Sequence, residues 1–174
     1  WLFVLGDMVM FSVLFTIFLY YRAQNVELFA TSQAQLNQTL GIVNTFLMLT
    51  SSWFVAMAVQ AARRNLGRVT QILLWLGFAC GVGFGVVKFF EWGAKISTGI
   101  TLTTNDFFMY YFIFTGIHFV HVLLGMLVLG VLARYTRAGD FDATKIRNLE
   151  SGASFWHLVD LLWIILFALL YLVK

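Results

Sequence analysis

The chain has 174 residues, of which 61% are hydrophobic and only 11% charged. Soluble domains carry about a quarter charged residues, so this composition excludes an ordinary water-soluble protein. The formal net charge of +3 comes from basic residues between long apolar runs, which favours membrane orientation over nucleic-acid binding. A single cysteine, Cys80, lies inside an apolar run, which excludes an internal disulfide and a cysteine-based metal site.

Apolar runs of about 20 residues or more follow one another along the chain, and this length crosses a bilayer as a helix. They cover residues 1–21, 39–62, 70–94, 107–133 and 152–173. Open sheets cannot cross lipid, and the runs are too long for barrel strands, so we predict an all-α, polytopic membrane bundle of five transmembrane helices. No linker or repeat divides residues 1–174, so one transmembrane domain is expected. Because the chain starts at Trp1, we also expect an N-terminal piece to precede it.

Basic residues are unevenly distributed over the connections between these spans. Seven lie in the second and fourth connections: Arg63, Arg64, Arg68, Arg134, Arg137, Lys145 and Arg147. Three lie on the opposite side: Arg22, Lys95 and Lys174. The positive-inside rule therefore predicts that the N-terminus is inside and the C-terminus outside. Tyrosines near the span ends are expected at the membrane interfaces: Tyr20, Tyr21, Tyr110, Tyr111, Tyr135 and Tyr171.

Ionisable residues within the spans form three pairs with the same i,i+3 spacing. They are Lys88 with Glu91, His118 with His121, and His157 with Asp160. Residues three apart share a helix face, so the imidazoles of His118 and His121 can reach the same point. Together with His157, they could bind iron or copper. A di-iron bundle, however, places a Glu three residues before a His, and no such motif occurs here. We therefore predict polar anchors between helices, with no metal ligand and no catalytic residue.

Asp7 differs from these pairs because no charged residue lies within one helical turn of it in WLFVLGDMVMFSVLF. Hydrocarbon favours the neutral form of a carboxyl group, and ionisable residues inside membranes are commonly functional. Two interpretations stay open: a group that accepts and donates protons, or a neutral carboxyl bonded to a neighbouring helix or a lipid headgroup.

The third span contains Gly77, Gly81 and Gly85 at four-residue steps. Small residues at this spacing allow two helices to approach closely in lipid, so we predict a helix-packing face here. The GVGFG run within it is no nucleotide loop, because it lies in the middle of a span with no strand before it.

Three segments resemble subunit III of the haem-copper respiratory oxidases. They are VNTFLMLTSSWF (43–54), FFMYYFIFTGIHFVHVLLGMLVLG (107–130) and ESGASFWHLVDLLWIILFALLYL (150–172). The last contains the polar residues Glu150, Trp156, His157 and Asp160. The TGxHxxHVxxG and WHxVDxxW patterns occur in order and at helix spacing, and the resemblance extends over nearly the whole chain.

The resemblance implies an accessory subunit of an oxidoreductase complex, with no catalytic centre, haem or metal of its own. Its partner would be the catalytic subunit I, which holds the haems and copper, together with other oxidase subunits and membrane lipids. It also implies support of proton uptake, protection during turnover, possible phospholipid binding and a bacterial plasma membrane location. Asp7 stands where many relatives have a glutamate, and Glu91 in KFFEW also resembles a family glutamate. His118 and His121 would then be structural anchors.

The chain resembles only the last five of the seven helices in the long form of this family. Either two helices precede Trp1, or the chain has the short five-helix form. Residues 20–59 look closest to the subunits found with bacterial nitric oxide reductases, which is the alternative within the family. Two remote alternatives are an independent transporter that uses Asp7, Lys88 and Glu91, and a membrane metalloenzyme built on the histidines.

Overall fold

A computed structural model describes residues 2–136 and 141–173. Within this part the chain is helical, in the order α1 (Leu2–Gln24), α2 (Val26–Ala34), α3 (Gln38–Arg63), α4 (Gly67–Ser97), α5 (Asp106–Tyr135) and α6 (Ala143–Phe167), followed by the π-helical turn η2 (Ala168–Leu172). Five of the described helical segments are long and apolar enough to cross a membrane, which agrees with the predicted fold class. Three residues used in the predictions above lie outside the described residues: Trp1, Arg137 and Lys174.

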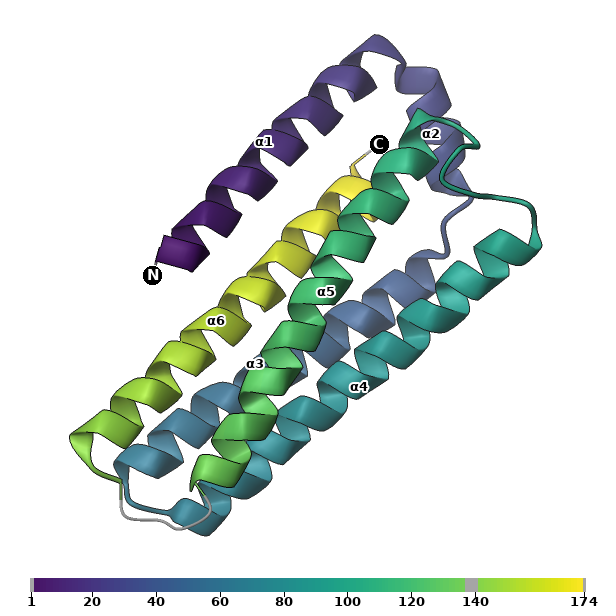
Figure 1. Ribbon diagram of the computed structural model, residues 1–174. Coiled ribbons are helices and arrows are strands. Elements are labelled where there is room, and N and C mark those ends of the chain that lie inside the picture. Colours follow the sequence, from purple (N-terminus) through teal and green to yellow (C-terminus); the bar gives the residue numbers. More distant parts are fainter. Residues whose placement is uncertain (1, 137–140, 174) are drawn as a thin grey trace.

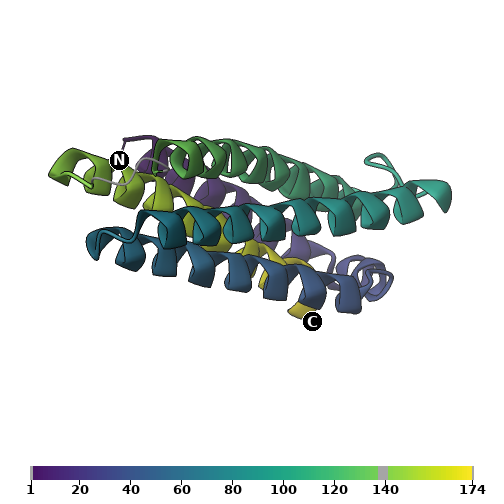
Figure 2. The same cartoon turned by 90° about the horizontal axis from the view of Figure 1, so that it is seen from below.

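The helices α3, α4, α5 and α6 form an antiparallel bundle in which each helix packs on its neighbours and α6 closes against α3 (Figure 1). Helix α1 lies on the side of α5 and α6 that faces away from α3 and α4 (Figure 2). Its phenylalanines make the contact: Phe15 meets Phe114, and Phe18 meets Tyr110. Because α1 is joined to the bundle by side chains along one face only, most of its surface is exposed, including Leu5, Met8, Val9 and Val13.

Capping residues fix where several helices begin. The side chains of Asn37, Asn105 and Asp142 accept hydrogen bonds from Leu40, Phe108 and Lys145 backbone N–H groups. Each bond satisfies a donor that the first turn of a helix cannot satisfy itself. At the opposite end of α3, Asn65 turns the chain with a φ of 59°.

Two segments expected as connections are partly helical, which corrects the predicted boundaries. Residues 143–151 belong to α6, and residues 26–34 form α2. Both segments are rich in residues that favour helices but too polar to be recognised by hydropathy. A helix can continue beyond the hydrocarbon layer, so the apolar run marks the span and not the end of the helix. Phe29 attaches α2 to the bundle through Phe18 and Phe107.

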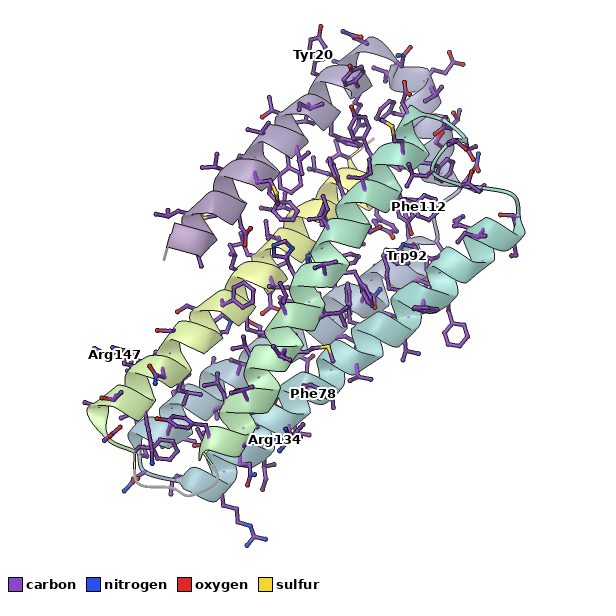
Figure 3. All side chains as sticks on the ribbon, viewed as in Figure 1. Tyr20, Phe78, Trp92, Phe112, Arg134 and Arg147 are labelled. Carbon is purple, nitrogen blue, oxygen red and sulfur yellow. The ribbon has the colours of Figure 1, made fainter. Side chains whose placement is uncertain are left out.

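The arginine-rich connections lie together at one end of the bundle, where Figure 3 shows Arg134 and Arg147. Tyr20 lies at the other end and is exposed, as Tyr21 and Tyr135 are. The expectation of an interfacial position is wrong for three other tyrosines, because their side chains are buried in the bundle: Tyr110, Tyr111 and Tyr171. Their hydroxyl and ring groups contribute to the interior of the bundle, as described below.

Candidate functional site

Asp7 on α1 lies beside His121 on α5, at the place where these two helices meet. The Asp7 Oδ2 and His121 Nε2 atoms are 3.3 Å apart, which is ion-pair distance, although the ring is not aligned for a hydrogen bond to Oδ2. Phe11 covers the imidazole ring from one turn further along α1. Both polar residues are buried, with 8% of Asp7 and 7% of His121 exposed. The carboxyl group that has no ionisable neighbour in the sequence therefore has one in the fold.

The imidazole of His121 is held in one orientation by its own helix. Nδ1 lies 2.8 Å from the Ile117 carbonyl oxygen. A carbonyl only accepts hydrogen bonds, so Nδ1 carries a proton in every state of this contact. Nε2 is then the basic nitrogen of a neutral ring, and it is the one that faces Asp7. Nε2 is therefore the only ring nitrogen through which His121 can exchange a proton with the Asp7 carboxyl group.

His118 faces a different part of the bundle, toward α4 and α6. Its ring packs between Phe84 and Trp163 at centroid distances of 5.6 and 5.4 Å. Neither ring nitrogen has a hydrogen-bond partner among residues 2–136 and 141–173, which corrects the expectation of a hydrogen bond across helices for this residue. The i,i+3 spacing was misleading, because the His118 ring contacts side chains of α4 and α6, whereas the His121 ring contacts side chains of α1. Within the described residues no group of three metal-binding side chains comes together.

Lys88 and Glu91 on α4 form an ion pair inside the bundle, with Nζ 3.0 Å from Oε2. Two tyrosines that the sequence placed at interfaces complete this cluster. The Tyr171 hydroxyl donates to Glu91 Oε1 at 2.5 Å and accepts from Lys88 Nζ at 3.1 Å, while Tyr111 lies 3.4 Å from the same Nζ. The ammonium also lies 5.0 Å from the centroid of the Trp163 ring. These groups thus provide hydrogen-bond partners for one another within an apolar interior.

His157 and Asp160 on α6 meet Ser52 on α3. The Ser52 hydroxyl and His157 Nδ1 are 2.7 Å apart, and the same Nδ1 is 3.6 Å from Asp160 Oδ2. Asp160 is buried, and neither of its carboxyl oxygens has a direct hydrogen bond within the described part of the chain. The predicted pair is thus an ion-pair contact through space, and the direct hydrogen bond of the imidazole goes to a serine.

Trp156 and Glu150 connect α6 to the bundle at two further points. Trp156 is buried, and its Nε1 donates to Ser51 Oγ at 3.1 Å; the Ser51 hydroxyl in turn donates to the Gly77 carbonyl at 2.8 Å. This chain of bonds links α6, α3 and α4. Glu150 accepts hydrogen bonds from Nε and Nη2 of Arg63 at 3.0 and 2.7 Å at the exposed end of α3.

The three glycines of α4 lie against other helices to different degrees. A Cβ at Gly77 would lie 3.0 Å from Val55, and one at Gly81 would lie 3.1 Å from Met126 and Trp156. A Cβ at Gly85 would meet Phe119 only at an ordinary contact distance of 3.5 Å, so close approach does not require glycine there. The closest approaches occur at Gly41, Gly125 and Gly152, which have no repeated spacing that the sequence could have revealed.

The fold and its buried pairs define the class of protein: a five-span membrane bundle whose intramembrane ionisable residues lie in pairs, two of them within one helix and one, Asp7 with His121, between two helices. Comparison with known proteins identifies the family. The chain belongs to the cytochrome c oxidase subunit III family, whose model matches residues 1–174. Members of this family have no catalytic centre of their own.

Curated relatives come from more than one kind of oxidase. Cytochrome c oxidase subunit 3 of Synechocystis sp. is 33% identical over 174 residues, which cover 98% of this chain and 72% of the relative. The protein of the same name from Thermostichus vulcanus is 30% identical, with 98% and 83% covered. Quinol oxidase subunit 3 of Bacillus subtilis is 28% identical, with 99% and 84% covered. These relatives do not favour the expected likeness to the subunits of nitric oxide reductases. Together with the five spans, they indicate a multi-pass membrane protein.

Proposed function

We propose that this chain is a non-catalytic accessory subunit of a respiratory haem-copper terminal oxidase and packs on the haem-bearing catalytic subunit. The family match over residues 1–174 supports this assignment, as do relatives that are subunits of cytochrome c and quinol oxidases. The relatives are bacterial, which supports a location in a bacterial plasma membrane, within aerobic electron transport. The arginine-rich end of the bundle would face the cytoplasm, so the N-terminus would be inside.

The contact between Asp7 and His121 carries the second part of the proposal, which is support of proton uptake. The two groups are 3.3 Å apart and largely shielded from the surroundings, and together they can hold or release one proton. Since the Ile117 carbonyl keeps a proton on Nδ1, exchange is directed to Nε2 and the carboxyl group. The pair would accept a proton at the surface of this subunit and pass it toward the catalytic subunit during turnover.

The Asp7→Asn variant tests this role in the purified complex. An amide cannot exchange the proton, so proton uptake during a single turnover is expected to slow in this variant. The haem content is expected to stay that of the parent complex. Asp7→Glu is the matched control, because it keeps the acid and is expected to keep most of the rate. An unchanged rate and pH dependence in Asp7→Asn would show that Asp7 has no proton role.

A further inference from the structure

Asp160 on α6 has a buried carboxyl group that the side chains around it do not satisfy. The residue is 3% exposed, and neither carboxyl oxygen has a hydrogen-bond partner among residues 2–136 and 141–173. Its ion-pair contact is with His157, whose Nδ1 lies 3.6 Å from Oδ2. Buried polar groups in folded proteins nearly always bond to the protein or to an ordered water molecule. Asp160 therefore needs a partner other than the described side chains.

Glu91 on α4 shows how this bundle satisfies a carboxyl group when its own side chains supply the donors. Glu91 Oε1 accepts a hydrogen bond from the Tyr171 hydroxyl at 2.5 Å, and Oε2 accepts one from Lys88 Nζ at 3.0 Å. Glu91 is 2% exposed, so it is buried as deeply as Asp160. Within the part of the chain that the structure describes, no lysine or arginine forms an ion pair with Asp160. The two buried carboxyl groups therefore differ in their neighbours and not in their burial.

The side chains next to Asp160 cannot supply all the hydrogens that its carboxyl group needs. The Ser52 hydroxyl and His157 Nδ1 are 2.7 Å apart and bond to each other. If Nδ1 is the donor, only the serine hydrogen is left to reach the carboxyl group. If the serine is the donor, no hydrogen of this contact is left. A carboxylate accepts through two oxygens, so at least one oxygen of Asp160 lacks a donor in either arrangement.

Water fits the position beside Asp160 in size and in hydrogen bonding. A hollow of about 400 Å³ lies on the seam between α3 and α6, and His157 is part of its lining. Ala56 and Ala153 also line it, each one helical turn from a residue of the contact, so small side chains leave room there. A buried water molecule needs such room and two to four polar partners. The carboxyl oxygens and the Ser52 hydroxyl provide these partners, whereas no group of three metal-binding side chains forms among the described residues.

We propose that an ordered water molecule binds beside Asp160, donates a hydrogen bond to its carboxyl group and bonds to the Ser52 hydroxyl. Water that bridges two polar groups is nearly as favourable as a direct hydrogen bond. Two paths then join α6 to α3 at this point, one from His157 to Ser52 and one from Asp160 through water to the same serine. The site goes beyond the proposed function, because it is built from residues of this chain and needs no partner subunit.

An electron cryo-microscopy map of the purified protein with its accompanying subunits, at a resolution that shows ordered water, tests the inference. A density peak is expected at a hydrogen-bond distance of about 2.5–3.0 Å from an Asp160 oxygen and from Ser52 Oγ. A map with well-resolved side chains and no such peak would overturn the inference. So would a direct bond from Asp160 to Ser52 or to a side chain of another subunit. Several contacts shorter than about 2.5 Å would indicate a metal ion and would also overturn it.

Infrared spectroscopy provides a second readout, which does not depend on the resolution of a map. A bound water molecule with few partners has a sharp O–H stretching band, which moves when the solvent is replaced by heavy water. Asp160→Leu is expected to abolish one such band, whereas Asp160→Asn is expected to keep it, because the amide oxygen still accepts. Ser154→Ala, on the same seam, is the matched control and is expected to leave the band unchanged. Identical bands in Asp160→Leu and the parent would contradict the inference.

Discussion

Two aspartates, Asp7 and Asp160, each lie next to a histidine. The two contacts differ in the orientation of the imidazole ring. His121 bonds to its own helix through Nδ1, so Nε2 faces Asp7 inside the contact between α1 and α5. His157 uses Nδ1 for Ser52 and lies partly exposed on the α3–α6 seam. The first arrangement suits exchange of a proton between two shielded groups, and the second suits a link between α6 and α3.

Removal of His157 tests the link at the residue scale. His157→Leu removes the imidazole that lies beside the buried Asp160 carboxyl group. Because this contact is lost, the free energy of unfolding of the subunit is expected to fall by about 0.6–2 kcal/mol. The double variant with Asp160→Leu is expected to recover much of this loss, since two apolar partners need no hydrogen bond. Thermal unfolding of the subunit in the purified complex measures both. A single variant as stable as the parent would contradict the anchor role.

The hydroxyl group of Tyr171 gives a second residue-scale prediction. Tyr171→Phe keeps the ring stacked on Phe167 but removes the donor to Glu91 and an acceptor for Lys88. A buried carboxylate oxygen would lose its partner, so the variant is expected to be less stable by about 1–3 kcal/mol. The exposed tyrosine Tyr135 provides the control, and Tyr135→Phe is expected to melt with the parent. Equal melting temperatures for both variants would show that the cluster adds no stability.

At the scale of the helices, close contact between α5 and α6 depends on a small residue at one point. A Cβ at Gly125 would lie 2.6 and 2.8 Å from Cε3 and Cζ3 of Trp156, and this ring is fixed by its bond to Ser51. The indole cannot retreat without breaking the chain of bonds that joins α6, α3 and α4. Gly125 therefore sets how closely these helices approach one another.

Gly125→Ala is expected to lower the free energy of unfolding by about 1–3 kcal/mol, the usual cost of overpacking a buried site. Gly116→Ala is the matched control on the same helix, because a Cβ there meets nothing within 4 Å. Thermal unfolding of the two variants in the same complex measures the difference. If Gly125→Ala and Gly116→Ala unfold at the same temperature, the contact between Gly125 and Trp156 does not require glycine.

The whole molecule shows which properties a sequence can and cannot predict. Hydropathy predicts the five spans, because each is a long run with few charged residues, but it misses α2 and the polar first turns of α6. Lys88 and Glu91 can be paired from their spacing, since both lie on one helix. Asp7 and His121 cannot, because their contact depends on how α1 packs on α5. The prediction of an interfacial position was wrong for Tyr111 and Tyr171 for the same reason. The position of a residue near the end of a span does not show which face of the helix is buried.

A reduced-minus-oxidised visible spectrum, recorded on the complex purified gently through a tag on this chain, shows which haems accompany the chain. The account predicts that haem bands of an oxygen-reducing haem-copper centre accompany the chain through purification. Bands of b- and c-type haems together with non-haem iron would instead indicate a nitric oxide reductase. A stable chain that purifies without any haem-bearing partner would contradict the account.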